Sequence, residues 1–114
     1  MIPMLPVRHL PATLPFYQQL GFCVEHRRDD WGWAMLELDG CRLMLDQSLH
    51  AAGGDGGGPR MGVIYLYPDD LAAFCAAARG RGLPLPDIEG TFYGHREVRI
   101  EDPDGNRLWI GQAE

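Results

Sequence analysis

The sequence contains no lysine, so all ten of its basic residues are arginine, against sixteen acidic residues. The resulting net charge of −6 argues against a nucleic-acid partner, because phosphates require a basic protein surface. An acidic surface suits a cationic small ligand, although many proteins without such a ligand are also acidic. The preference for arginine is typical of a GC-rich bacterial genome.

Cysteine is scarce, with three residues, an odd number, and no Cys-x-x-Cys pair. This pattern argues against a disulfide framework and favours reduced thiols in the cytoplasm. We expect Cys23 and Cys75 to lie in the core, because their sequence neighbours are apolar.

Long apolar runs are also absent, which predicts no membrane partner. The first residues, "MIPMLPVRHLP", are broken by prolines and lack the apolar core of a signal peptide. The glycine-rich stretch "HAAGGDGGGPR" lacks the Gly-Lys-Ser/Thr of a phosphate-binding loop, so we expect a flexible linker at residues 50–60.

A repeat is the strongest pattern that the sequence does contain. The stretch "DGCRLMLDQ" at Asp39–Gln47 returns as "DGNRLWIGQ" at Asp104–Gln112. Each copy begins with an Asp-Gly turn and continues as a strand. Because the similarity extends upstream, we predict two modules of the order strand, helix, strand, strand, strand, at residues 1–49 and 61–114, within a single α+β domain.

The expected helices are Thr13–Leu20 and Leu71–Arg81. Pro15 places the start of the first helix near Thr13, because a proline beyond the first turn removes a hydrogen bond. In the second, Asp69 or Asp70 can cap the helix and Gly82 suits the residue that follows it. The expected strands are Ile2–Arg8, Phe22–Arg28, Trp33–Leu38, Arg42–Asp46, Gly62–Tyr67, Leu85–Glu89, Glu97–Glu101 and Arg107–Gly111.

Alternation along these strands separates two sheet faces. The side covered by the helices is predicted to carry Leu5, Val7, Leu36, Leu38, Leu43, Leu45, Ile64, Leu66, Val98, Ile100, Leu108 and Ile110. The opposite side has no helix left to cover it, and an apolar face of that size should be buried by a partner or should bind a ligand. Its predicted residues are Ile2, Met4, Trp33, Met35, Arg42, Met44, Asp46, Val63, Tyr65, Tyr67, His95, Glu97, Arg99 and Trp109.

Four histidines are scattered along the chain, and only His95 is expected on the helix-free face. We expect His9 to be structural, His26 to be solvated and His50 to open the linker. His95 is open to two interpretations, a ligand contact or a hydrogen-bonded strand residue. No Ser-His-Asp or Cys-His constellation can be assembled, so no catalytic residue is predicted.

The stretches "FYQQLGF", "MGVIYLYPDDLAAFCAAARGRGL" and "YGHREVRIEDPDGNRLWIGQ" resemble the vicinal oxygen chelate superfamily, and the last is most similar to its bleomycin-resistance branch. The resemblance covers nearly the whole chain. It implies two βαβββ modules that form a cup-shaped sheet with helices on its convex face, assembled as a homodimer. It also makes Met44 and Trp109 equivalent residues inside the cup.

Metal-dependent members of this superfamily carry histidine, glutamine or glutamate on the first and last strands of each module. The resemblance places these positions at Ile2, Met44, Val63 and Trp109. None of the four suits a hard or borderline divalent cation, which binds carboxylate, imidazole or thiolate. We therefore expect no metal and no cofactor.

The resulting hypothesis is a metal-free, cytoplasmic antibiotic-resistance protein that sequesters a cationic or aromatic small molecule. Trp33 and Trp109 fit either ligand contact or dimer core, and Asp30 and Trp31 fit either a ligand-attracting loop or an ordinary turn. Predicted ligand contacts are Asp30, Trp31, Trp33, Met35, Met44, Asp46, Val63, Tyr65, Tyr67, His95, Glu97 and Trp109.

Two alternatives remain open at this stage. One is a metal-dependent lyase, isomerase or dioxygenase with displaced ligands at His95, Glu97 and Asp46. The other is a structural or regulatory dimer whose cup binds nothing.

Overall fold

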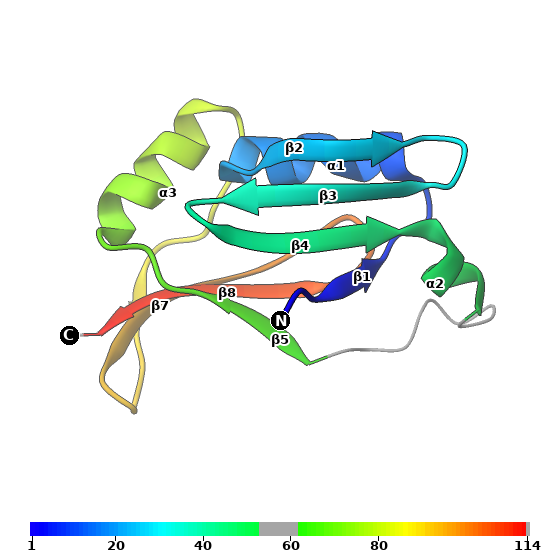
Figure 1. Cartoon of the computed structure of the whole chain (residues 1–114). Helices are drawn as coiled ribbons and strands as arrows, with labels where there is room; N and C mark the ends of the chain where they lie inside the picture. Colours follow the sequence, from blue (N-terminus) through cyan, green and yellow to red (C-terminus); the bar gives the residue numbers. More distant parts are fainter. Residues whose placement is uncertain (53–61, 114) are drawn as a thin grey trace.

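The computed structural model describes residues 1–52 and 62–113 as an α+β fold of two modules, each with its own four-stranded sheet (Figure 1). This confirms the predicted fold class and the predicted βαβββ order. The first sheet has the strand order β1 (Met4–Pro6), β4 (Cys41–Asp46), β3 (Trp33–Leu38) and β2 (Cys23–Arg28). The second has the order β5 (Val63–Leu66), β8 (Arg107–Ala113), β7 (His95–Glu101) and β6 (Glu89–Gly90).

Three helices accompany the sheets. Helix α1 (Leu10–Leu20) joins β1 to β2 and runs behind β2 and β3 in Figure 1, whereas α3 (Leu71–Gly80) joins β5 to β6. The short α2 (Gln47–Ala52), which we did not predict, follows β4 and takes up the first residues of the expected linker; the rest of that linker lies outside the described residues. No helix in the described ranges has the length and apolar content that a membrane span needs.

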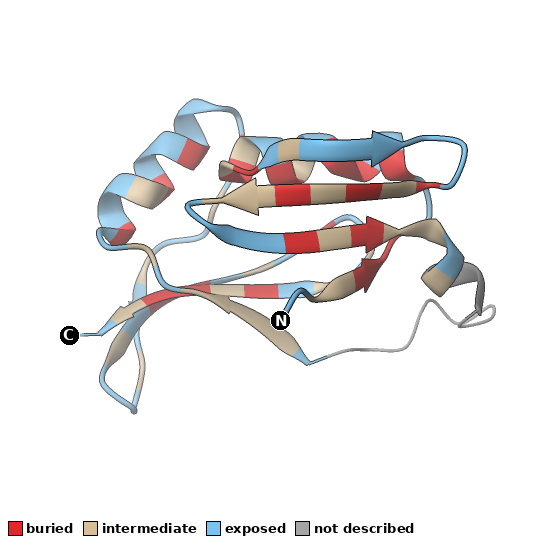
Figure 2. Ribbon diagram, in the orientation of Figure 1, coloured by how far each residue is buried: buried red, intermediate tan, exposed pale blue. Residues whose placement is uncertain are grey.

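Both modules contribute to one hydrophobic core, as the predicted alternation required. Along β3 and β4, buried residues alternate with half-buried or exposed ones (Figure 2). Of the twelve residues predicted on the helix side, eight are fully buried and the other four, Leu38, Ile64, Leu66 and Ile100, pack against the buried cluster. The opposite faces of both sheets therefore remain without a helix.

The repeated glutamine has the same structural role in both modules. Gln47 Oε1 accepts a hydrogen bond from the backbone N–H of Leu10 at 2.8 Å, and Gln112 Oε1 accepts one from Leu71 at 3.0 Å. Each acceptor satisfies a backbone donor that the first residue of a helix leaves unpaired. In both modules the repeated glutamine thus connects the end of the last strand to the start of the helix.

The turn before β8 joins the second module to the first. Buried Asp102 accepts a hydrogen bond from the Tyr17 hydroxyl of α1 at 2.6 Å, and its other oxygen accepts from the backbone N–H groups of Asp104 and Asn106. Asp104 in turn accepts from Thr13 Oγ1 at 2.6 Å, and Asn106 Nδ2 donates to the Pro6 carbonyl at 2.9 Å. This cluster fixes α1 and the end of β1 against the second module.

The prediction that the first helix begins near Thr13 is wrong, because α1 begins at Leu10 and contains Pro15. A proline inside a helix costs about 3 kcal/mol. The helix tolerates it because Gln47 satisfies its first donor and because it buries Leu10, Leu14, Tyr17 and Leu20 along one side. Tertiary contacts thus override a local penalty.

Two further local predictions are corrected. The strand predicted at Leu85–Glu89 is reduced to β6 (Glu89–Gly90), because Pro84 and Pro86 cannot donate to a strand partner. Arg79 Nη2 instead donates to the carbonyls of Leu85 and Pro86. Cys23 is exposed, because it faces away from the core on the edge strand β2, whereas Cys75 is buried as predicted.

We predict that Tyr17→Phe lowers the free energy of unfolding by about 1–2 kcal/mol, because the Asp102 carboxylate loses a buried hydrogen-bond donor. Urea denaturation at pH 7 measures this change. The matched control is Tyr67→Phe, which changes an exposed tyrosine and should stay within about 0.5 kcal/mol of the parent. Equal stability of parent and Tyr17→Phe would contradict the proposed role of this bond.

The same variant should change the alkaline limb of the stability curve. Burial, followed by the charge of Asp102 and its hydrogen bond, raises the pKa of Tyr17 well above the ordinary value. Because the folded state favours the neutral phenol, this contribution is complete below pH about 10 and is lost as the pH rises further. Urea titrations above pH 10 should therefore show a shallower loss of stability in Tyr17→Phe than in the parent.

Candidate functional site

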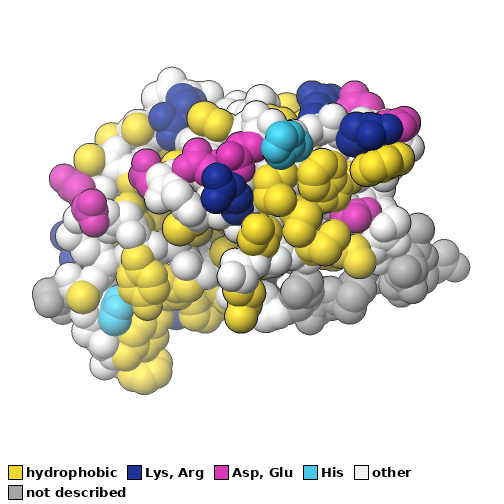
Figure 3. Space-filling model, viewed as in Figure 1, with side chains coloured by type: hydrophobic (Ala, Val, Ile, Leu, Met, Phe, Trp, Pro, Cys, Tyr) yellow, Lys and Arg dark blue, Asp and Glu magenta, His cyan; other side chains and the backbone are white. Residues whose placement is uncertain are grey.

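The helix-free faces of the two sheets differ in chemistry. Figure 3 shows this side of the molecule, with one hydrophobic area over β3 and β4 and another around a histidine near the β7 end of the second sheet. We name the first the methionine face, with Met4, Trp33, Met35, Met44 and Asp46. We name the second the tyrosine–glutamate face, with Val63, Tyr65, His95, Glu97, Arg99 and Trp109, which cross-strand pairing places together.

Glu97 is the centre of the tyrosine–glutamate face. Glu97 lies on β7 and on a face that no helix covers, yet only 3% of the residue is exposed. Its Oε2 accepts hydrogen bonds from the hydroxyls of Tyr65, at 2.5 Å, and Tyr93, while its Oε1 accepts from Arg99 Nε at 2.9 Å. Burial by itself would raise the pKa of Glu97, but these three hydrogen bonds outweigh it and lower the pKa. The carboxylate therefore stays ionised at neutral pH.

Tyr65 reaches Glu97 only because residue 111 is a glycine. A Cβ at Gly111 would lie 2.0 Å from the Tyr65 hydroxyl oxygen, far closer than atoms can approach. Burial, then the hydrogen bond to Glu97 and the charge of Glu97, raise the pKa of Tyr65 well above its ordinary value. Gly111 pairs with Glu97 across β7 and β8, so the glycine opens the space that the tyrosine ring fills.

Arg99 covers the ring of Trp109. Its guanidinium carbon lies 3.9 Å from the centre of the indole, a cation–π distance. Glu97 and Arg99 thus pair with each other, which the sequence did not predict, and Trp109 already has a cation on one face. Trp109 is half-buried, as a residue accessible to a ligand would be.

An aromatic group surrounds His95. The centre of the His95 ring lies 5.3 Å from that of Tyr93 and 6.0 Å from that of Tyr67. The ring centres of Tyr67 and Tyr65 lie 4.5 Å apart. The sequence did not identify Tyr93 as a residue of this face. A turn at Gly94, where φ is 79°, precedes β7 and lets the Tyr93 hydroxyl reach Glu97. The Tyr-Gly dipeptide immediately before a strand was the available signal for this turn.

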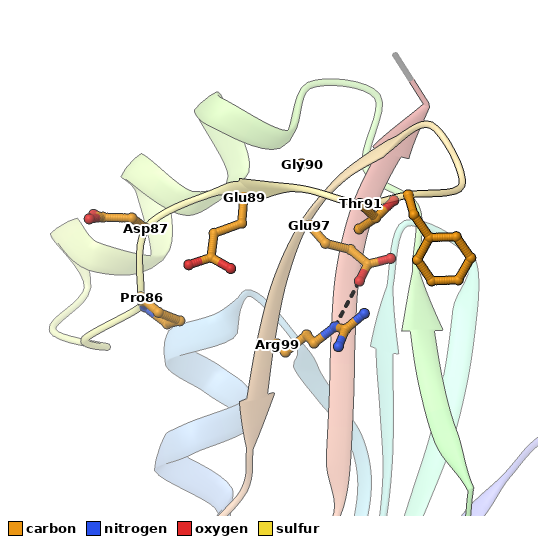
Figure 4. Close-up of a pocket in the computed structure, with 8 residues that line it drawn as sticks. Pro86, Asp87, Glu89, Gly90, Thr91, Glu97 and Arg99 are labelled. Carbon is orange, nitrogen blue, oxygen red and sulfur yellow. Dashed lines mark hydrogen bonds and ion pairs between the residues drawn. The ribbon is translucent and has the colours of Figure 1, made fainter.

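A cavity of about 410 Å³ lies between Glu97 and the segment that contains β6 (Figure 4). Three carboxylates line it, from Asp87, Glu89 and Glu97, together with Arg99 and the fully exposed Phe92. In Figure 4 the Glu89 side chain extends from β6 into the space between Pro86 and Arg99, whereas the Asp87 carboxylate points away from Arg99. The dashed line marks the Glu97–Arg99 ion pair. The net negative lining suits a cationic group.

The methionine face is less polar. Trp33 Nε1 donates to Met44 Sδ at 3.1 Å, and Met35 is the direct cross-strand partner of Met44. Asp46, beside Trp33, accepts from the backbone and hydroxyl of Ser48 and so stabilises the start of α2. A second cavity, of about 460 Å³, lies between the N-terminal residues, β4 and β5, and includes Ile2 and Tyr65.

In the loop at Asp30 and Trp31, both side chains already contact an arginine of the adjoining strand. Arg28 forms a bidentate pair with Asp30, and its guanidinium lies 4.0 Å from the Trp31 ring centre. The hydrogen bond from Arg28 lowers the pKa of Asp30. Asp29 pairs with Arg27 in the same way, so the acidic charge expected at this loop is balanced locally.

The alternative metal ligands do not meet. Asp46 lies on the first sheet, whereas His95 and Glu97 lie on the second. Within residues 1–52 and 62–113 no group of three or more His, Cys, Asp or Glu side chains is arranged to hold a metal ion.

Comparison with known proteins supports the assignment of a family. The model of the glyoxalase/bleomycin resistance protein/dioxygenase superfamily matches residues 3–110. The chain belongs to this superfamily. A search of curated proteins gives no match.

Solved structures with the same fold include a bleomycin-binding protein in complex with bleomycin, 26% identical, with a TM-score of 0.75 over 100% of this chain and 98% of that one. A bleomycin resistance determinant encoded on transposon Tn5 is also 26% identical, with a TM-score of 0.75 over 100% and 97% of the two chains. A lactoylglutathione lyase from Agrobacterium tumefaciens is 19% identical, with a TM-score of 0.72 over 98% and 92%, which shows the fold alone.

We predict that Glu97→Gln lowers the pKa of Tyr65 toward the ordinary value, because the variant removes the charge that opposes ionisation of the phenol. Ultraviolet titration of the tyrosines, with Tyr65→Phe subtracted to assign the transition, measures the shift. Asp69→Asn, a charge change outside this face, is the control and should leave the transition in place. An unchanged transition in Glu97→Gln would show that the two side chains do not interact in solution.

Proposed function

We propose that this protein binds and sequesters a cationic, partly aromatic small molecule of the bleomycin type, without breaking bonds. The observation that carries the proposal is the ionised Glu97 on an aromatic, helix-free sheet face beside an acid-lined cavity. Similarity to a bleomycin-binding protein along the whole chain supports it. An ionised carboxylate and aromatic rings in one place are the groups that attract and stack a flat cation.

Arg99 has a specific role in this proposal. Its guanidinium occupies the Trp109 ring face and pairs with Glu97, the two groups that a flat cationic ligand would use. The Arg99 side chain is about half exposed, so a ligand cation that pairs with Glu97 and stacks on Trp109 can replace it. The arginine then acts as an internal substitute that keeps the carboxylate paired while the site is empty.

The proposed contacts extend over both helix-free faces. On the second sheet they are Val63, Tyr65, Tyr67, His95, Glu97 and Trp109, and on the first they are Trp33, Met35, Met44 and Asp46. Asp30 and Trp31 belong to the proposed set only if the ligand displaces Arg28, which occupies both.

The positions that metal-dependent relatives use do not fit a divalent metal here. Ile2 and Val63 have no donor atoms, Met44 offers a soft thioether, and Trp109 offers an indole whose face is covered by Arg99. We therefore propose binding without a divalent metal, and no step of a metal-dependent reaction is assigned to this chain.

We also propose that the protein is a homodimer, because two helix-free faces leave a large apolar area that a second copy would cover. Tyr67 is 66% exposed and Phe92 99% exposed, although both are large and apolar. Sedimentation velocity at micromolar concentration should show a dimer in the absence of ligand. A monomer under these conditions would contradict this part of the proposal.

The binding prediction uses metal-free bleomycin as the probe. It should change tryptophan fluorescence saturably, and Trp109→Ala should weaken binding by about 1–3 kcal/mol, as expected for loss of a central aromatic contact. The core side of β8 is held by Leu108 and Ile110, so the variant should remain folded. Glu97→Gln should also weaken binding, because it removes the charge that attracts the cation.

Asp69→Asn serves as the charge control and should bind as the parent does, and prior dialysis against a chelator should leave the affinity unchanged. Absence of saturable binding in the parent would reject sequestration of this ligand class. Unfolding or dimer loss in Trp109→Ala, without ligand binding in the parent, would identify Trp109 as a core residue.

A further inference from the structure

One row of sulfur-containing side chains crosses the first sheet. Met4 of β1 and Met35 of β3 are both direct cross-strand partners of Met44 on β4. Direct partners in an antiparallel pair, such as Met35 and Met44, have Cβ atoms about 4.5–5.5 Å apart. The parallel strands β1 and β4 that carry Met4 and Met44 lie about 4.8 Å apart. All three methionines are half-buried on the helix-free face, since their strand neighbours Leu5 and Leu45 point into the core.

A bulge in β2 adds an imidazole to this row. In an unbroken strand Val24 and His26 would share one face. The register shifts between them, so that Val24 pairs with Leu36 of the core side and His26 pairs with Met35 of the helix-free side. Bulges of this kind redirect a side chain. Figure 3 shows a histidine at the upper border of the hydrophobic area over β3 and β4.

We propose that the methionine row, defined as His26, Met35, Met44 and Met4, binds a soft monovalent cation, Cu(I) or Ag(I). Soft ions of this kind bind thioether and imidazole ligands, whereas zinc, iron and manganese favour harder or charged ligands. Methionine has three rotatable bonds, so the sulfurs of Met4 and Met35 can converge over Met44.

The surroundings of Met44 support this site. Trp33 Nε1–H donates to Met44 Sδ at 3.1 Å, which holds the sulfur on the helix-free side. This proposal does not depend on antibiotic binding. Trp33, Met35 and Met44 belong to both proposed sites, but the metal ion needs no residue of the tyrosine–glutamate face, so Glu97→Gln separates the two proposals.

The experiment is a titration with silver nitrate in chloride-free buffer. Cys23 and Cys41 are exposed, and thiolates bind soft ions strongly, so a Cys23→Ser/Cys41→Ser background without a histidine tag is used throughout. We expect one silver ion per chain and shifted NMR signals from the labelled methyl groups of Met4, Met35 and Met44. The fully exposed Met1 should not shift.

Met44→Leu should weaken silver binding about tenfold or more, because leucine has no sulfur donor. The fold should be preserved, because leucine and methionine have nearly the same volume. His26→Ala should weaken it by a smaller factor, and Met1→Leu is the matched control with unchanged affinity. Glu97→Gln should retain silver binding even where it loses bleomycin binding, so failure of one proposal is distinguishable from failure of the other.

Three results would overturn the site. The first is unchanged silver affinity in Met44→Leu. The second is binding that disappears once Cys23 and Cys41 are replaced, which would assign the metal to the thiols. The third is absence of silver binding in the Cys23→Ser/Cys41→Ser background.

Discussion

The fold depends on the buried carboxylate of Asp102, which unites the two modules. It accepts hydrogen bonds from the turn that precedes β8 and from Tyr17 on α1, so the same side chain shapes one module and holds the helix of the other. Asp104 and Asn106 of the same turn extend the connection to Thr13 and Pro6. A buried carboxylate is costly unless its oxygens are paired, and here the turn and the tyrosine hydroxyl supply the partners. The core can then be shared by both sheets, and their other faces carry no helix.

Duplication produced two similar backbones with different surfaces. Met44 and Trp109 occupy matching places in the repeat, as do Asp46 and Gly111. The change from aspartate to glycine has a large effect, because only a glycine leaves room for Tyr65 to reach Glu97. One module therefore presents a polar cluster with an ionised carboxylate, and the other presents thioethers. The proposed cationic ligand and the proposed soft metal ion follow from this difference in side chains on a common backbone.

Much of the candidate site could be predicted from alternation in the strands. Leu108 and Ile110 identified the buried side of β8 and thereby placed Trp109 on the helix-free side, and cross-strand pairing in the structure agrees. The interactions among those residues could not be predicted. The position of Arg99 over Trp109 depends on which rotamer its neighbours allow, and the contact of Tyr93 with Glu97 depends on the turn at Gly94. The ion pairs of Arg27 and Arg28 likewise arise from the shape of one loop.

By itself the sequence determined the number of modules, the faces of most strands and the positions of the Asp-Gly turns, because these depend on local periodicity and on backbone preferences of single residues. Tertiary structure decided where local rules give way. Pro15 lies inside α1 because the helix packs one side into the core and because Gln47, distant in sequence, accepts a hydrogen bond from the N–H of Leu10, so that these contacts offset the penalty of the proline. The bulge at Glu25 turns His26 to the helix-free face, which strict alternation cannot reveal. In each case the outcome depends on a partner distant in sequence, and the free energy of that contact is not encoded in the local pattern.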